Sequence, residues 1–366
     1  MHFEINTSEL KAALKDVSGT VGGAMPITAC VLIEPDDDRI KLTTTSLESS
    51  TVSYIDGLGE GFRIALPHRE LTAIINRAKS ESVRFELVGD LRVKIDAGRA
   101  ISELSGSDPD TFPTVHAGDT SNAFNIDAKD LLAGLEYISY AMSKDVARPS
   151  LNGMFLQQDG GKLTAVATDG HRLVVHDFGE VAAELDELKK GVILGREGVL
   201  SLQNVLKSHD GNVMISVGRT VSASVGTTQL NFSVIGGIYP SYRHVIPSRS
   251  SGDTVTVSVK DLLDAIADVV PTIQRDLPIA RLHLSVDGCT IRSRGDDMFT
   301  LVDLGDLVWP STELEIGANV NYLTDALRAV TTDEAEITFN GPLKPIVFRR
   351  ADADDGSVSI VMPTRI

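Results

Sequence analysis

Three amphipathic helix patterns at domain-length spacing constrain this chain more than any other feature of its sequence. Apolar or small residues occupy positions i, i+3, i+4 and i+7 in segments 10–17, 131–138 and 262–269. This spacing places them on one face of a helix. Successive patterns begin at Leu10, Leu131 and Leu262, so the steps are about the length of a small domain. The sequence therefore predicts three copies of one domain.

Each predicted domain is itself doubled. The same helix spacing recurs at 71–78 and 323–330, and less regularly at 199–206, where Gln203 takes an apolar position. Alternating strand patterns lie between the helices, at 91–95 and 221–225. Further strand segments recur at 41–43, 162–164 and 289–291. We therefore expect an α+β fold in which one helix plus a few strands forms the repeated unit.

Composition and cysteine content favour a soluble protein of several domains. A chain of 366 residues is longer than those that usually fold around a single hydrophobic core, so several domains are expected. Its 42% hydrophobic residues are enough to form packed cores. No apolar stretch is long enough to span a bilayer, and residues 1–5 resemble a strand rather than a signal peptide. Cys30 and Cys289 lie in different repeats and predict small core residues rather than a disulfide or metal site. A reducing, cytoplasmic location is expected.

The charge distribution restricts how the chain can bind nucleic acid. A net charge of −17 argues against a general nucleic-acid binder, because phosphate contacts need a basic surface. Positive residues nevertheless gather on or beside the predicted helices, so an acidic body with a basic inner face would hold DNA inside. The alternative is that they are ordinary solvated helix faces. The third repeat weakens the DNA interpretation, since Asp261, Asp264 and Asp268 lie on its first helix.

Breaker residues predict two linkers between the repeats. Segment 108–113 contains two prolines and ends the first copy, while segment 239–247 ends the second with a Tyr-Pro pair and a further proline. Polar residues follow both segments. We therefore place domain boundaries at 1–120, 121–248 and 249–366.

Four ordered motifs give the sequence a specific resemblance. They are Leu-Asn-Gly-Met at 151–154, Thr-Asp-Gly-His-Arg-Leu at 168–173, Tyr-Pro-Ser-Tyr-Arg at 239–243 and Val-Met-Pro-Thr-Arg-Ile at 361–366. The set resembles the bacterial sliding clamps, the beta subunits of DNA polymerase III, over the whole chain. The resemblance implies a head-to-tail homodimer that closes six domains into a ring, with helices inside and sheets outside. Such a ring encircles duplex DNA without reading its sequence.

The resemblance also implies three sets of functional residues. DNA-facing positions are Lys11, Lys15, Arg77, Lys79, Lys144 and Lys207. A pocket for short peptides of DNA polymerase III alpha, other polymerases, the clamp loader and repair factors comprises Leu151, Thr168, Gly170, His171, Arg172, Leu173, Pro240, Val245, Val361, Met362, Pro363 and Arg365. In this pocket the apolar residues would form an adaptable floor, while Arg172 and Arg365 would orient a partner's backbone or acidic group. The dimer interface would contain Ile101, Leu104, Val270 and Ile273.

Other classes of function stay open at this point. Asp169 and His171 suggest a metal or acid–base site, but Asp169-Gly170 is first of all a turn signal and the spacing matches no zinc pattern. No nucleophile–base or paired-carboxylate signature predicts an enzyme. Segment 18–25 has no basic residue and segment 148–150 no aromatic one, which puts local DNA contacts in doubt. The missing basic residue and the acidic first helix of the third repeat allow an accessory protein that binds clamp partners without being loaded on DNA. A monomeric peptide-binding scaffold is a third alternative. We expect a sliding clamp without catalytic activity, cofactor or metal.

Overall fold

The computed structural model describes residues 1–113, 123–182, 185–293, 298–305, 307–351 and 356–366. The chain divides into two compact units. Unit 1 comprises Met1–Leu135, Gln157–Gly161 and Glu180–Gly236; unit 2 comprises Glu136–Leu156, Lys162–Gly179 and Gly237–Ile366. The predicted domain boundary at residues 120 and 121 lies outside the described residues.

All six predicted amphipathic helices are confirmed. They are α1 (Thr7–Asp16), α2 (His68–Arg77), α3 (Ala128–Ser139), α5 (Arg196–Leu206), α6 (Val259–Val269) and α7 (Val320–Ala329). Polar residues cap several of them: the Asn6 side chain accepts bonds from Ser8 N and Glu9 N before α1, and Asn319 accepts one from Asn321 N before α7. A short helix that the periodicity did not predict, α4, spans Asp186–Lys190.

Unit 1 is built on antiparallel strands. Strand β1 (His2–Asn6) pairs with β4 (Ser49–Glu60) and β6 (Ser82–Leu87), and β6 continues through β7 (Arg92–Asp96) to β8 (Ile101–Ser105). Strand β2 (Cys30–Asp36) pairs with β3 (Arg39–Thr45) and β5 (Ile64–Pro67), and β3 pairs with β4. The strand segments predicted at 41–43 and 91–95 fall in β3 and β7, although Leu91 precedes β7.

The long strand β4 also links two of the sequence repeats. Its first part pairs with β16 (Thr228–Ile235), which continues through β15 (Thr220–Val225) and β14 (Asn212–Val217) to β9 (Ala123–Asp127). Strand β13 (Val192–Gly195) pairs with the other end of β16. One sheet therefore runs continuously from the first repeat into the second, and residues 51 and 230 lie opposite each other at the join.

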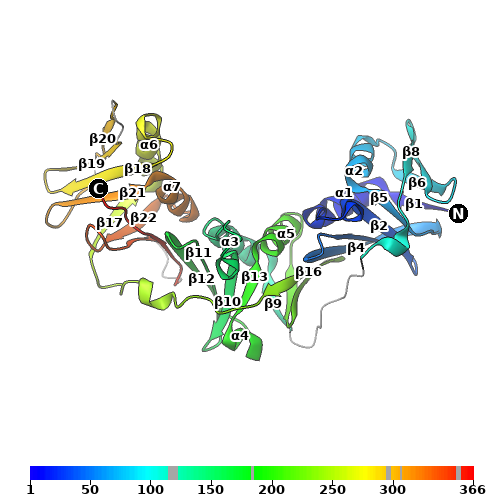
Figure 1. The fold of residues 1–366 in the computed structure, drawn as a ribbon, viewed down its shortest axis with the longest axis horizontal. Helices are drawn as coiled ribbons and strands as arrows, with labels where there is room; N and C mark the ends of the chain where they lie inside the picture. The colour runs from blue at the N-terminus through cyan, green and yellow to red at the C-terminus, as the bar shows by residue number, and fades with distance from the viewer. Residues whose placement is uncertain (114–122, 183–184, 294–297, 306, 352–355) are drawn as a thin grey trace. The chain divides into compact units, whose positions relative to one another are not determined.

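The core of the first repeat lies between its helices and its sheet. Helices α1 and α2 contact each other (Figure 1). They bury Leu10, Leu14, Leu71 and Ile75. Burial of such side chains stabilises the fold by roughly 1.5–3 kcal/mol each. Cys30 is also buried and free, as predicted.

Unit 2 contains the C-terminal repeat and the part of the central repeat that pairs with it. Strand β17 (Asp253–Ser258) pairs with β22 (Glu334–Phe339), which continues through β23 (Ile346–Arg350) and β24 (Val358–Val361) to β12 (Arg172–Glu180). A second sheet has the order β20 (Leu301–Asp303), β19 (Gly288–Ser293), β18 (Ile279–Ser285), β21 (Leu314–Asn319). Helices α6 and α7 contact each other above a core that includes Trp309 and the buried free Cys289.

The second predicted linker is more ordered than its composition suggests. It contains a short 3₁₀ helix at Arg243–Val245, and the Tyr239 and Tyr242 rings are buried. The Tyr239 ring stacks on Phe155 of β10 (Gly153–Asp159), with the ring centres 4.8 Å apart. These aromatic residues anchor the segment in unit 2. Among the described residues, no helix is both long enough and apolar enough to cross a membrane.

Candidate functional site

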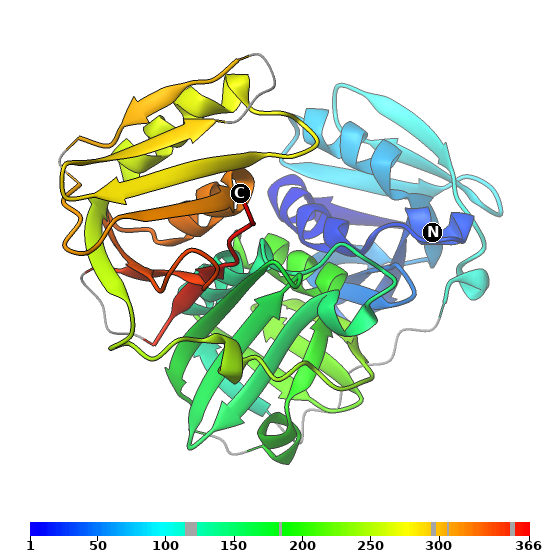
Figure 2. The same cartoon turned by 60° about the vertical axis from the view of Figure 1, so that its left-hand side comes forward.

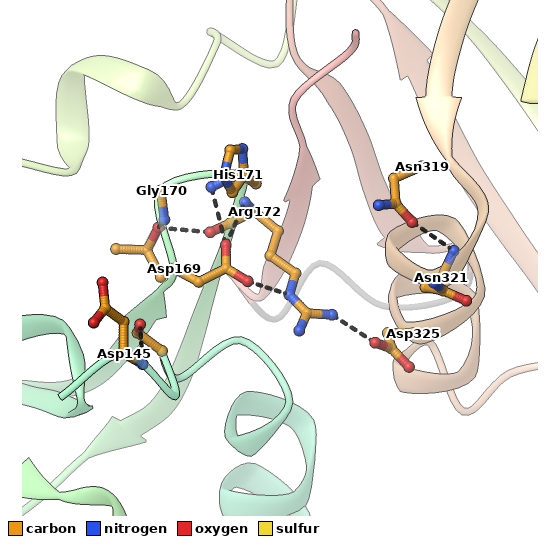
Figure 3. A network of polar contacts seen from close by, with 10 residues as sticks. Asp145, Asp169, Gly170, His171, Arg172, Asn319, Asn321 and Asp325 are labelled. Atoms are coloured by element: carbon orange, nitrogen blue, oxygen red, sulfur yellow. Dashed lines mark hydrogen bonds and ion pairs between the residues drawn. The ribbon is translucent and has the colours of Figure 1, made fainter. Parts of the chain in front are cut away.

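A tight turn between β11 (Lys162–Thr168) and β12 holds the residues of the Thr-Asp-Gly-His-Arg motif (Figure 3). The Asp169 carboxylate accepts hydrogen bonds from His171 N at 2.9 Å and Arg172 N at 3.1 Å. Thr168 Oγ1 accepts a bond from Gly170 N at 3.1 Å and donates one to Arg172 O at 2.6 Å. Gly170 has φ 92°, a left-handed conformation that favours glycine. The turn predicted at Asp169-Gly170 is therefore confirmed.

Arg172 is fixed by two carboxylates and two aromatic rings. Its Nε lies 2.9 Å from Asp169 Oδ2 and its Nη1 lies 2.5 Å from Asp325 Oδ2 on α7 (Figure 3). The guanidinium carbon also lies 4.6 Å from the ring centre of Tyr322 and 5.2 Å from that of Tyr140. Both contacts are within the range of cation–π attraction.

The electrostatics of Arg172 follow from these partners. Burial by itself would lower the pKa of Arg172, but the hydrogen bond to Asp325 and the ion pair with Asp169 raise that pKa above its usual value. The side chain is only 12% exposed, so the guanidinium is held by this chain and has little freedom to turn toward an acidic group of a partner. Arg172 thus has a fixed position, because it pairs with Asp169 of the turn and with Asp325 of α7 at the same time.

An apolar pocket of about 250 Å³ opens beside this turn. It brings together eight of the twelve predicted pocket residues, from four separate segments of the chain: Leu151, Thr168, Gly170, Arg172, Leu173, Pro240, Val245 and Met362. All of them belong to unit 2. The pocket has a mainly apolar lining with a few polar groups, which is the composition of a site for an apolar anchor.

The other four predicted pocket residues lie elsewhere. Val361 packs into the core of the C-terminal repeat, because side chains on a strand alternate between faces and it follows the lining residue Ile360. His171 is exposed, and its ring lies 6.1 Å from Tyr322, nearly parallel to it. Pro363 is half-buried and Arg365 is exposed, and neither lines the pocket.

Three further residues that the sequence did not predict line the pocket. They are Ser241, Tyr242 and Ile360. The alternation of strand faces could have identified Ile360, since Met362 lies two positions later on the same face. Tyr242 belongs to the Tyr-Pro-Ser-Tyr motif, but nothing in the sequence indicates which tyrosine of that motif faces the pocket.

The C-terminal tail is held in place from both sides. Strand β24 pairs with β12 and β23, so that Val361 lies opposite Arg172 and Ile346. Beyond the strand, Met362 N donates to His171 O and Thr364 N donates to Gly317 O on β21, both at 2.8 Å. Figure 2 shows this C-terminal end of the chain in red, beside the orange segment that includes α7. The absence of a side chain at Gly317 is required, because a Cβ there would lie 2.8 Å from Thr364 O and closer still to Ile366.

Five of the six predicted DNA-facing residues belong to unit 1. Helix α1 contacts both α2 and α5, and two of its lysines bond to the neighbouring segments. Lys11 Nζ donates to Ala78 O at 3.0 Å after α2, and Lys15 Nζ donates to Ser208 Oγ at 2.9 Å after α5. The exposed members of the set near these helix ends are Lys15, Arg77, Lys79 and Lys207. The sixth residue, Lys144, is exposed in unit 2.

The predicted interface residues are divided between the two units. Ile101 is 62% exposed on β8, while Leu104 of the same strand is half-buried against the core of the first repeat. In unit 2, Val270 is 47% exposed just after α6, and Ile273 is half-buried against the core of the last repeat. Each pair thus has one exposed member and one member that packs against the core of its own repeat.

Comparison with known proteins covers the whole chain. Residues 1–116, 125–241 and 243–365 match the N-terminal, central and C-terminal domains of the DNA polymerase III beta subunit. The beta sliding clamps of Vibrio cholerae and Pseudomonas aeruginosa are 26% and 29% identical to the chain, with full coverage of both sequences.

Solved structures agree with the sequence matches. The DNA polymerase III subunit beta from Pseudomonas aeruginosa has a TM-score of 0.90 at 29% identity, and covers all of both chains. A DnaN sliding clamp from the same species, bound to griselimycin, has a TM-score of 0.91 at 28% identity with the same coverage. The predicted three-domain α+β architecture is therefore confirmed, and the chain belongs to the DNA polymerase III beta subunit family, the bacterial beta sliding clamps.

Proposed function

We propose that this sliding clamp works as a head-to-tail homodimer, a closed ring that encircles duplex DNA and tethers a replicative polymerase. The match to three clamp domains along the full chain carries the proposal. A closed ring is retained by topology, so its contacts with phosphate need only be weak and salt-sensitive. The function requires no chemistry from the chain, and we infer that the protein has no catalytic activity, cofactor or metal and acts in the cytoplasm.

We propose that the basic residues of unit 1 face the DNA. Lys15, Arg77, Lys79 and Lys207 lie on or beside three helices that contact one another through α1. Flexible lysine and arginine side chains on a helical surface attract phosphate without fixing the DNA in one register. Lys11 has a second role, because its ammonium group already bonds to the Ala78 carbonyl at the end of α2.

We propose that the 250 Å³ pocket binds short peptide motifs of DNA polymerase III alpha, other polymerases and the clamp loader. The chemistry of the lining supports this proposal. Leu151, Leu173 and Ile360 provide an apolar surface, and the flexible Met362 side chain can adapt to different ligands. A related clamp has been solved with griselimycin bound, so a protein of this fold holds a ligand. Deleting residues 362–366 is expected to abolish peptide binding and leave the dimer intact.

We propose that two sheet edges of different subunits meet in the dimer. Strand β8 pairs with β7 along one side, and β20 ends the order of the C-terminal four-stranded sheet. Ile101 on β8 and Val270 after α6 would bury their exposed apolar surface on association. The proposed domains, 1–120, 121–248 and 249–366, give each subunit three of the six positions in the ring.

Retention on circular and linearised plasmid DNA tests the ring directly. The full chain would be loaded with the matching clamp loader and ATP and then separated from free protein by gel filtration. We expect retention on the circle and loss after one cut. Equal retention on both forms would show direct binding and refute the topological mechanism. Retention on neither form, with normal dimerisation and peptide affinity, would favour an accessory protein that binds clamp partners without being loaded.

A further inference from the structure

The peptide-pocket turn has a structural repeat in the first domain. Between β3 and β4, Thr45 Oγ1 accepts a bond from Leu47 N and donates one to Ser49 O, both at 3.0 Å. Thr168 Oγ1 makes the same two bonds, with Gly170 N and Arg172 O. The two turns therefore have one hydrogen-bond pattern, and the third residue of each has a left-handed backbone, with φ 79° at Leu47 and 92° at Gly170.

The residue at that third position differs between the repeats. Glycine adopts positive φ without steric cost, whereas leucine is strained there because its Cβ approaches the backbone. The strained Leu47 side chain is nevertheless 51% exposed, so burial in the core does not offset its strain. Strained backbone conformations of this kind cluster at functional positions in proteins.

Leu47 lies on the edge of a groove of about 640 Å³ in unit 1. Helix α5 contributes Leu200, 38% exposed, and Glu197 to the same groove. Segment 19–24 lines the rest of the groove, together with Ser46, Glu48 and Ser201. The lining of the groove comes from two regions of the chain, one that matches the N-terminal clamp domain and one that matches the central clamp domain.

The groove is formed before any ligand binds. Ser201 Oγ donates to Gly19 O at 2.7 Å, which ties the glycine-rich segment to α5. Gly23 packs so closely over the turn that a Cβ there would lie 3.1 Å from Ser46 O. Binding a ligand in such a site costs little conformational entropy in the protein.

The charges at the edge identify the kind of ligand. Glu48 and Glu197 are exposed, and within the described part of the chain neither forms an ion pair. Two carboxylates repel DNA phosphate and attract cations, so a positively charged peptide complements this groove better than DNA does. The two exposed leucines require an apolar residue in the same segment.

We propose that this groove, defined by Leu47, Glu48, Glu197 and Leu200, is a second docking site. It binds a short segment of a partner protein in which lysine or arginine residues flank an apolar anchor. The anchor packs between the two leucines, and the flanking cations face the two glutamates. This inference goes beyond the proposed function, because the groove is separate from the peptide pocket of unit 2 and shares no residue with it.

Selection of peptides against matched variants tests the proposal. A random twelve-residue phage-displayed library would be panned on the full-length wild-type dimer and counter-selected on the Leu47→Gly variant. Fluorescent copies of the selected peptides would then be titrated against wild type, Leu47→Gly and the double variant Glu48→Lys with Glu197→Lys. Leu58→Ala is the control, because Leu58 is an exposed leucine of the same unit, 79% exposed on β4, outside the groove.

The expected peptides contain Lys or Arg beside an apolar residue, and both groove variants weaken their binding by about tenfold or more. Leu58→Ala leaves their affinity unchanged. Leu47→Gly keeps the thermal midpoint within about 2 °C, since relief of strain offsets the greater freedom of glycine in the unfolded chain. The proposal fails if no basic peptide distinguishes wild type from Leu47→Gly, if Leu47→Gly instead weakens binding of duplex DNA, or if that variant unfolds at a markedly lower temperature.

Discussion

The ion pair between Arg172 and Asp325 provides a direct test of how the pocket wall is held. Replacing Asp325 by Asn removes the negative charge but keeps an oxygen that can accept a hydrogen bond from the guanidinium group. Asp169 still pairs with Arg172 in this variant, so the buried cation keeps one carboxylate partner. The change therefore isolates the contribution of the second charge.

The expected magnitude follows from the exposure of the two groups. A hydrogen bond to a charged group contributes about 1.5–3 kcal/mol, and its neutral counterpart is roughly half as strong. Arg172 is 12% exposed but Asp325 is 37% exposed, so solvent screening reduces the difference. We expect Asp325→Asn to lower the free energy of unfolding by about 1 kcal/mol, which lowers the thermal midpoint by roughly 2–4 °C. Peptide affinity should fall by up to about fivefold.

Calorimetry measures the change in the thermal midpoint, and fluorescence anisotropy with a clamp-binding peptide measures the change in affinity. The control is Asp264→Asn on α6, which breaks the exposed Lys260–Asp264 pair and should leave both quantities unchanged. A double-mutant cycle with Arg172→Met separates the pair from each residue's other contacts. Strictly additive effects in that cycle would refute the argument, because they would mean that Asp325 acts independently of Arg172.

Three further predictions concern stability and the C-terminal tail. Burial raises the pKa of Asp16, against the attraction of nearby His209. From about pH 4 up to that raised pKa the folded chain keeps a proton that the unfolded chain has lost, so stability should fall as pH rises. Asp16→Asn should remove this slope from pH-dependent unfolding curves, and an unchanged slope would assign it to another group. Gln203 buries an Nε2 that has no hydrogen-bond partner among the described residues. Gln203→Met should raise the free energy of unfolding in urea by about 1 kcal/mol, and a lower value would show that the amide is needed. Gly317→Ala should displace the tail and weaken peptide binding about tenfold by anisotropy, whereas wild-type affinity would mean that the tail does not shape the pocket.

Much of the architecture could be predicted from local sequence pattern. The six helices were predicted because each must bury one apolar face, and the 3.6-residue period records that requirement directly. The extra helix α4 was missed because it has only five residues, too few to establish a period. The linker tyrosines looked like loop residues, and only the packing of Tyr239 on Phe155 shows that they are anchors.

The candidate site was predicted less completely than the fold. Eight pocket residues come together as the family motifs imply, but Val361 faces the opposite side of its strand and Ile360 takes its place. Arg172 looked available to a partner, whereas Asp325, far away in the sequence, already pairs with it. No local pattern predicts such a pair, because the two residues meet only when β12 and α7 are packed.

The sequence by itself determined the three repeats, the α+β class and, through its motifs, the sliding-clamp family. These properties depend on periodicity and short-range order, which every unfolded copy of the chain already contains. The tertiary structure alone decided which side chains line the pocket and that Arg172 is paired with Asp325. It also decided that Leu47 lies in a strained turn and lines a groove together with residues of α5. Those properties depend on contacts between distant segments, and they arise only when strand pairing and helix packing fix the segments in space.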